Sequence, residues 1–208
     1  MPEDVPTPID FLTLEDAREW ERAALRVRPW RTEFFEMFAS EISIHKPRVT
    51  KVLELGSGPG FLAEHVLNLM PELSYVALDF SAAMHELARA RLASHVGNVE
   101  FVERSFKADG WTDGLEDFHC VVTNQAVHEL RHKNYAAALH AEVLKVLSPG
   151  GLYLMCDHFA GDDAMTNTEL YMAKEEHRSA LQGCGFSALE ELKSFDTLVM
   201  YRALKGGG

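Results

Sequence analysis

The 208-residue sequence contains little cysteine and no long hydrophobic run. Cys120, Cys156 and Cys184 are odd in number and form no C-x-x-C pair, which argues against a disulfide scaffold and fits a reducing compartment. No run approaches the ~18 apolar residues of a membrane-spanning helix, and Met1–Pro8 is acidic and proline-rich, unlike a signal peptide. We therefore expect a cytoplasmic protein without a membrane partner.

Basic residues are also few, because 20 Lys and Arg stand against 32 Asp and Glu, giving a net charge of −12. Such a surface repels phosphate backbones, so nucleic acid is a disfavoured partner. A local basic patch remains an alternative near the N-terminus, where five arginines cluster: Arg18, Arg22, Arg26, Arg28 and Arg31. The length and the 47% apolar fraction predict one globular domain with a sizeable core. The sequence does not decide between a monomer and a homodimer.

Strand and helix patterns alternate along most of the chain. Residues 1–12 resemble a loose arm, and two helices around a break at Pro29 should complete an N-terminal lid over residues 1–46. From residue 47 to 205 we expect one globular domain, with strands over 51–55, 75–78, 99–102, 118–123, 152–156, 188–192 and 197–203 and helices over 62–69, 82–92, 135–147 and 169–182. This alternation predicts an α/β fold with a parallel sheet covered on both faces. Only a few residues join the last two strands, so these should pair antiparallel.

A glycine-rich turn follows the first predicted strand. Gly56, Gly58 and Gly60 are spaced G-x-G-x-G, and glycine permits both φ > 0 and close approach of the backbone to a ligand. The helix that follows points free N–H groups at the same crevice. Asp79 ends the next strand, 19 residues after Gly60, which is roughly the offset of an acidic residue that binds ribose hydroxyls. Neither the dinucleotide spacing G-x-G-x-x-G nor a P-loop is present.

With Glu54, this segment resembles motif I of the class I S-adenosylmethionine (SAM)-dependent methyltransferases, commonly E/D-x-G-x-G-x-G. The resemblance covers roughly residues 48–205 and implies a seven-stranded, mostly parallel sheet whose last strand inserts antiparallel. It implies that SAM binds and that S-adenosylhomocysteine is the product. The implied cofactor-binding residues are Glu54, Gly56, Ser57, Gly58 and Gly60 for the methionine moiety, Asp79 for the ribose, Phe80 and Met84 for the adenine, and Ser105, Phe106, Asn124 and Gln125 nearby. Core packing is an equally good reading of Phe80 and Met84. Arg104-Ser105 replaces the Gly-Asp pair that relatives often carry.

His128 is the best candidate for a general base, because the pKa of an unperturbed imidazole, near 6.5, suits proton removal at neutral pH. The alternative is that His128 only lines the acceptor pocket. Asp157 and His158 end the fifth strand, and either could reach an acceptor, but neighbours in a strand point in opposite directions and form no dyad by themselves. We predict no metal, since no third and fourth ligand can be named beside His128 and His158.

The N-terminal helices carry an aromatic and basic set that similar enzymes use as a lid over the acceptor, namely Trp20, Trp30, Arg31 and Phe34. Docking of this set on the sheet is the alternative. The sequence therefore predicts a SAM-dependent methyltransferase acting on an O, N or S atom of a small molecule. A protein or RNA methyltransferase is the closest enzymatic alternative, and a non-catalytic interaction subunit with the same fold is another.

Overall fold

The computed structural model describes residues 2–7, 9–45 and 48–207. The chain forms two compact units, a first unit of residues 8–108 and a second unit of residues 109–208 together with 1–7. The predicted boundary between residues 46 and 47 falls at positions outside the described residues, so that division stays a prediction. Within the described ranges, no helix is long and apolar enough to span a membrane.

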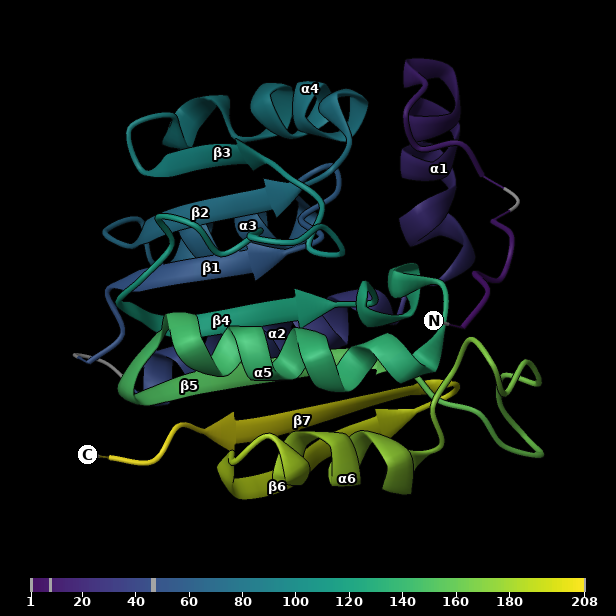
Figure 1. Cartoon of the computed structure of the whole chain (residues 1–208). Helices are drawn as coiled ribbons and strands as arrows, with labels where there is room; N and C mark the ends of the chain where they lie inside the picture. The colour runs from purple at the N-terminus through teal and green to yellow at the C-terminus, as the bar shows by residue number, and fades with distance from the viewer. Residues whose placement is uncertain (1, 8, 46–47, 208) are drawn as a thin grey trace. The chain divides into compact units, whose positions relative to one another are not determined.

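The first unit contains three parallel strands in the order β3-β2-β1 (Figure 1). Its elements in chain order are α1 (Leu14–Val27), α2 (Arg31–Ile44), β1 (Lys51–Leu55), α3 (Phe61–Leu69), β2 (Ser74–Asp79), α4 (Ala82–Arg91), η1 (Ala93–His95) and β3 (Val99–Glu103). Strands β1 and β2 are almost entirely buried, which explains their continuous apolar runs. Helix α4 begins at Ala82, as predicted, because the Ser81 hydroxyl accepts from the Met84 N–H at 3.0 Å and caps the helix.

The second unit contains four strands in the order β4-β5-β7-β6. Its elements are β4 (Phe118–Asn124), η2 (Val127–Leu130), η3 (Lys133–Tyr135), α5 (Ala136–Val146), β5 (Leu147–His158), α6 (Lys174–Gly183), β6 (Ser187–Phe195) and β7 (Leu198–Leu204). Strand β4 pairs parallel with β5, whereas β7 pairs antiparallel with both β5 and β6. The predicted antiparallel insertion of the last strand is therefore confirmed. Helices α5 and α6 pack against each other in front of these strands (Figure 1).

The helix predicted over residues 169–182 begins five residues later, at Lys174. The Asn167 side chain accepts from the N–H groups of Glu169 and Leu170, both at 3.1 Å, and this local turn competes with a helix. The helix then starts where the Glu176 carboxylate accepts from the Ala173 N–H at 2.8 Å. Leu170, Tyr171 and Met172 are thereby left outside the helix.

The prediction of a loose arm over residues 1–12 is wrong for the part that lies in the second unit. The Val5 N–H donates to the Arg131 carbonyl at 2.8 Å, and the Tyr135 hydroxyl donates to the Pro2 carbonyl at 2.9 Å. In the first unit, the Phe11 carbonyl accepts from the Ser81 hydroxyl. The arm's prolines cannot form a helix, but their carbonyls still accept hydrogen bonds.

Candidate active site

The glycine loop of the first unit joins β1 to α3 with three left-handed residues. Gly56, Gly58 and Gly60 have φ of 67°, 52° and 82°, values that L side chains rarely adopt. A Cβ on Gly60 would lie 3.2–3.3 Å from side-chain atoms of Ala88 and Leu92, so this glycine also permits close packing against α4. Gly56 donates to the Leu78 carbonyl at 2.8 Å, which ties the loop to the end of β2.

Asp79 holds the loop in place. Its buried carboxylate accepts from the Gly58 N–H at 2.8 Å and from the Ser81 N–H at 2.9 Å. The carboxylate therefore fixes the loop backbone and stands beside it, at the carboxyl end of β2. Its predicted contact with ribose hydroxyls stays a prediction.

Glu54 in β1 is 2% exposed and accepts a hydrogen bond from the Tyr75 hydroxyl at 2.9 Å. Burial raises the pKa of Glu54 to about 8; the Tyr75 hydrogen bond opposes the shift and the charge of Asp79 adds to it. At neutral pH this side chain is therefore mostly a neutral acid.

In the second unit, the ends of β4 and β5 bring His128 against Asp157. The Asp157 carboxylate accepts from the His128 backbone N–H at 2.8 Å and from Nδ1 of its ring at 2.6 Å. Gln125, with φ of 58°, turns the chain after β4, and its N–H donates to the Cys156 carbonyl at 2.7 Å. This turn places the short helix η2, and hence His128, beside the end of β5.

The charges of this pair stabilise each other. Burial lowers the pKa of His128, but the carboxylates of Asp157 and Glu129 outweigh burial and raise that pKa to about 10. Burial likewise raises the pKa of Asp157, yet His128, with smaller contributions from other histidines, lowers it to about 2. Oε1 of Glu129 lies 3.2 Å from Nε2 of His128, so both ring nitrogens face a carboxylate. His128 is therefore an imidazolium at neutral pH, not the unperturbed histidine assumed from the sequence.

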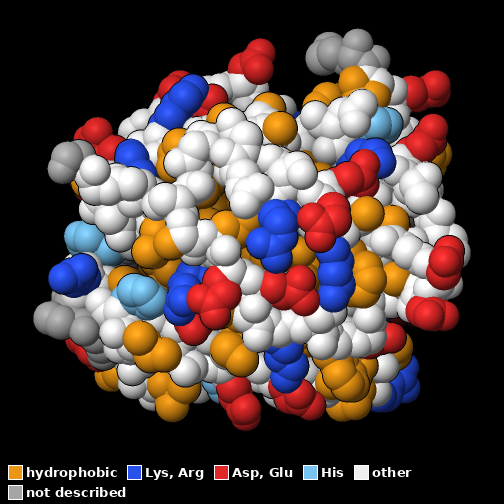
Figure 2. All heavy atoms as spheres, turned by 90° about the horizontal axis from the view of Figure 1, so that it is seen from below, with side chains coloured by type: hydrophobic (Ala, Val, Ile, Leu, Met, Phe, Trp, Pro, Cys, Tyr) orange, Lys and Arg blue, Asp and Glu red, His pale blue; other side chains and the backbone are white. Residues whose placement is uncertain are grey.

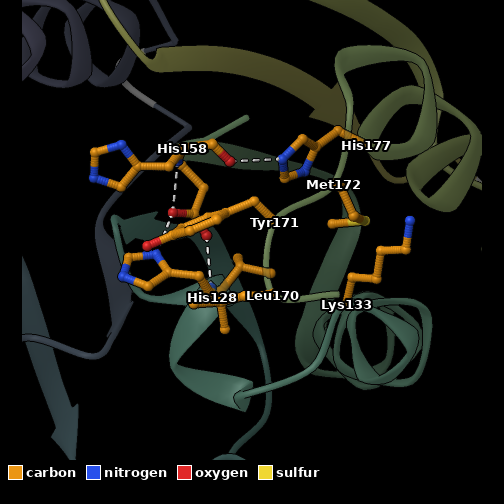
Figure 3. Close-up of a pocket in the computed structure, with 9 residues that line it drawn as sticks. His128, Lys133, His158, Leu170, Tyr171, Met172 and His177 are labelled. Carbon is orange, nitrogen blue, oxygen red and sulfur yellow. Dashed lines mark hydrogen bonds and ion pairs between the residues drawn. The ribbon is translucent and has the colours of Figure 1, made fainter. Parts of the chain in front are cut away.

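Three rings gather at a pocket in this unit. The rings of His128 and His158 extend in the same direction, 5.4 Å apart, and the Tyr171 ring lies beside both, at 5.4 Å from His128 and 5.9 Å from His158 (Figure 3). Nδ1 of His158 lies 2.8 Å from the Thr197 hydroxyl. The pocket is small, with a cavity volume of about 10 Å³, which is room for about one water-sized group. It therefore suits one functional group of a ligand.

Comparisons with known proteins give matches to methyltransferases. The family model described as "Methyltransferase domain" matches residues 52–151, which include the glycine loop, Asp79 and His128. Residues 52–151 therefore match a methyltransferase domain, in agreement with the resemblance carried by the glycine loop and Asp79.

Among solved structures similar to this chain, an O-methyltransferase family protein from Burkholderia thailandensis has a TM-score of 0.75 at 20% identity, covering 95% of this chain and 62% of that chain. The structure titled "PigF with SAH" has a TM-score of 0.71 at 14% identity, covering 94% and 60%. These similarities confirm the predicted seven-stranded fold class.

Among curated proteins, the malonyl-[acyl-carrier protein] O-methyltransferase of Paenibacillus sp. (strain JDR-2) is 31% identical over 83 residues, 39% of this chain and 30% of its own length. The chain therefore matches under a third of this relative and under two thirds of the two solved chains.

Several features of the glycine loop suit a nucleoside with an amino-acid tail, such as SAM. The Ser57 hydroxyl is buried and has no hydrogen-bond partner among the described residues. A Cβ on Gly58 would meet nothing within 4 Å, so the loop is open on that side. Phe80 follows Asp79 directly and is 40% exposed, as suits an aromatic ring that stacks on a base.

The other predicted cofactor residues fall into two groups. In the first unit, Met84 packs in a buried cluster with Ala17, Ala83 and Trp20, which favours the core reading, and the Ser105 hydroxyl accepts from the Lys107 N–H at 3.2 Å. Phe106 is buried. In the second unit, Asn124 and Gln125 lie at the end of β4, and Oδ1 of Asn124 is buried with no partner among the described residues. Contacts of these residues with SAM remain predictions.

The proposed lid residues contact one another within the first unit. The Arg31 guanidinium lies 5.2 Å from the Trp20 ring, which meets Phe11 edge-on at 6.1 Å, while Trp30 meets Phe34 at 6.3 Å. These contacts do not test the predicted role of the four residues as a lid over the acceptor.

Arg91, which the sequence did not single out, anchors α1 to the glycine loop. It donates to the Pro59 carbonyl at 2.8 Å and pairs with Glu21 at 2.6 Å and Glu64 at 3.0 Å. Its partners are distant in sequence, so no local pattern marks it.

The sequence also missed most of the pocket in the second unit, namely Lys133, Leu170, Tyr171, Met172 and His177. Nε2 of His177 donates to the His158 carbonyl at 3.2 Å. The turn-forming Asn167 was the available signal that residues 170–172 are not helical. In the described part of the chain, no group of three His, Cys, Asp or Glu side chains could hold a metal ion.

Proposed function

We propose that this chain transfers a methyl group from SAM to a small-molecule acceptor, whose nucleophilic group enters the pocket beside His128. The observation that carries the proposal is the buried His128–Asp157 pair, with Nδ1 and Oδ1 only 2.6 Å apart, at the mouth of a small pocket. A charged pair of this kind in a pocket is typical of catalytic sites, where pKa values are strongly shifted.

The glycine loop, Ser57, Asp79 and Phe80 would hold SAM, whose sulfonium supplies an activated methyl group. Asp79 would accept from the ribose hydroxyls, and the open side of Gly58 leaves space for a ligand against the backbone. Support for this cofactor comes from the domain match and from the solved relative titled with SAH.

The role of His128 follows from its charge. With a pKa of about 10, roughly one molecule in a thousand carries the neutral imidazole at pH 7. This neutral form is a strong base and can take the proton of an acceptor hydroxyl whose own pKa is near 10, such as a phenol. The charged form can instead hold an acceptor that is already an anion. Relatives named O-methyltransferases support oxygen as the acceptor atom.

Two observations favour a small molecule over a macromolecule. The pocket is small, and the face shown in Figure 2 carries acidic and basic side chains next to each other, which offers no basic stripe for a nucleic acid. Incubating a cell extract with the protein and radiolabelled SAM tests this choice, since label in protein or RNA would favour the macromolecular alternatives.

Calorimetry with S-adenosylhomocysteine tests the cofactor site. Phe80→Ala should weaken binding about tenfold, because base–aromatic stacking contributes roughly 1–3 kcal/mol. Phe195→Ala removes a similarly exposed ring from the second unit, 47% against 40%, and should leave affinity unchanged. No heat with the folded wild type would instead favour a non-catalytic interaction subunit.

Turnover of an acceptor found in that extract tests the base. His128→Gln should lower kcat about 10²–10⁴-fold with SAM affinity preserved, whereas His95→Gln in the first unit should not. For a hydroxyl acceptor, kcat/KM of the wild type should rise about tenfold per pH unit from pH 7 toward the pKa near 10, because the neutral imidazole grows at that rate. A flat profile would contradict the base role and indicate an imidazolium that holds an anionic acceptor.

A further inference from the structure

Residues 2–6, here called the strap, are bound to one short segment of the second unit. Three hydrogen bonds join Arg131 to the strap, from the Val5 N–H to its carbonyl at 2.8 Å and from its guanidinium to the carbonyls of Val5 and Pro6 at 3.0 and 2.7 Å. A fourth runs from the Tyr135 hydroxyl to the Pro2 carbonyl. The strap therefore fixes both the backbone and the side chain of Arg131.

Arg131 in turn reaches His128 through Glu129. Nη1 of Arg131 donates to Oε2 of Glu129 at 3.3 Å, and Oε1 of the same carboxylate lies 3.2 Å from Nε2 of His128. Each link is a charged contact in a partly buried region, with side chains between 13% and 24% exposed. A continuous chain of contacts thus runs from the strap to the ring nitrogen of His128 that does not bind Asp157.

The backbone conformation of Arg131 gives a second reason why the position of this residue should depend on the strap. Its φ of 65° is left-handed, a conformation that costs a non-glycine residue energy and persists where the surroundings hold it. The strap supplies hydrogen bonds to this residue that the short helix η2 cannot supply itself.

The two contacts of His128 differ in strength. The Nδ1 contact with Asp157 measures 2.6 Å and that carboxylate is 1% exposed, whereas the Nε2 contact with Glu129 measures 3.2 Å. Asp157 is thus the fixed partner and Glu129 the exchangeable one. An acceptor oxygen that approached Nε2 would have to take the place of the Glu129 carboxylate.

We propose that the strap, through Arg131, positions Glu129 on Nε2 of His128, so that docking of the strap controls whether this nitrogen is occupied by Glu129 or open to the acceptor. Arg131 is then a positioning residue and Glu129 an internal substitute for the acceptor anion. The consequence for acceptor binding rests on the proposed function, but the contact itself can be tested without SAM or an acceptor.

The test is an NMR titration of the full chain labelled with ¹⁵N-histidine, with His128→Gln used to assign the signals of His128. The ionisable groups around this ring are Asp157, Glu129, His158, His177 and Tyr171; in addition, Arg131 pairs with Glu129, and Lys133 lines the same pocket. Glu129→Gln should lower the pKa of His128 by about one unit, since it removes an adjacent opposite charge.

Arg131→Gln decides between positioning and simple charge. If Arg131 holds Glu129 in place, the variant should lower the pKa of His128 as Glu129→Gln does, and the double variant should lower it no further. If Arg131 acted only as a nearby cation, its loss would raise that pKa, which would overturn the proposal. Arg202→Gln, which removes a pair with Glu190 elsewhere in the unit, should change nothing.

The strap is tested by two variants that alter no charge. Val5→Pro removes the N–H that donates to Arg131, and Tyr135→Phe removes the hydroxyl that binds Pro2; circular dichroism checks that each folds. Together they should lower the pKa of His128 in the same direction as Arg131→Gln. If the pKa of His128 is unchanged in both variants, the proposed role of the strap is overturned. Because no substrate is present, either result stands whether or not methyl transfer is later demonstrated.

Discussion

Glu54 in the first unit and Asp157 in the second are both buried carboxyl groups near the end of a strand, but one is neutral and the other charged at neutral pH. Glu54 in the first unit faces the Tyr75 hydroxyl, and its pKa is raised to about 8. Asp157 in the second unit faces His128, and its pKa is lowered to about 2. Both are nearly inaccessible to solvent, at 2% and 1% exposure.

The difference shows that the partner, not burial, decides the charge. Burial is the largest effect on both groups and raises both pKa values. A neutral hydroxyl offers one hydrogen bond and cannot offset that cost, whereas an imidazolium offers a charge as well. The first unit therefore keeps a proton on its acid, and the second keeps an ion pair.

The largest expected effect comes from breaking the ion pair. Asp157→Asn leaves the imidazolium of His128 without its buried partner and should cost about 3–5 kcal/mol in the free energy of unfolding, measured by urea denaturation. It should also lower the pKa of His128 toward its ordinary value. Asp162→Asn, at an exposed position of the same unit, should stay within about 0.5 kcal/mol. An equal decrease in the free energy of unfolding of the two variants would contradict an ion pair at Asp157.

A smaller effect is expected from replacing the neutral acid. A folded pKa of about 8 against 4.5 means that stability from protonated Glu54 is complete below pH 4.5 and is lost as pH rises through 8. Glu54→Gln cannot ionise, so its free energy of unfolding relative to wild type should increase by about 1.4 kcal/mol per pH unit above pH 4.5, or about 3 kcal/mol by pH 6.5.

The effect of Glu54 on stability can be separated from that of the His128–Asp157 pair by the choice of pH range. The stability that the pair contributes falls only below pH 3.8, where Asp157 of the unfolded chain takes up a proton, and above pH 6.5, where His128 of the unfolded chain loses one. Between pH 4.5 and 6.5, Glu54 should therefore change while the pair does not. Glu100→Gln, exposed in β3, serves as the control. Parallel curves for wild type and Glu54→Gln across this window would show that Glu54 is already ionised.

The first unit could largely be predicted from the sequence, because its signals are local. The glycine spacing, the Ser81 cap and the apolar strands each act over a few residues, and the structure has them where they were predicted. Arg91 is the exception, since it joins Glu21, Glu64 and Pro59 across long sequence separations.

The second unit was predicted less completely, because its site depends on pairings between distant segments. His128 and Asp157 were both candidates, but their pairing, 29 residues apart, required the register of β4 beside β5. The raised pKa of His128 follows from that pairing, and the position of Tyr171 follows from the Asn167 turn. The contacts of residues 2–6 with Arg131 span 125 or more residues and leave no local pattern.

The smallest expected effect comes from weakening the partner of Glu54 without changing any charge. Tyr75→Phe removes the hydroxyl that donates to the Glu54 carboxyl at 2.9 Å while keeping the ring in the core. Because that hydrogen bond favours the charged form, its loss should raise the pKa of Glu54 further. The free energy of unfolding should fall by about 0.5–1.5 kcal/mol. The pH at which wild-type stability declines should therefore move upward in the variant, as followed by urea denaturation between pH 6 and 9. A downward shift would mean that the hydroxyl stabilises the neutral acid, and that the contrast with Asp157 depends on burial more than on the partner.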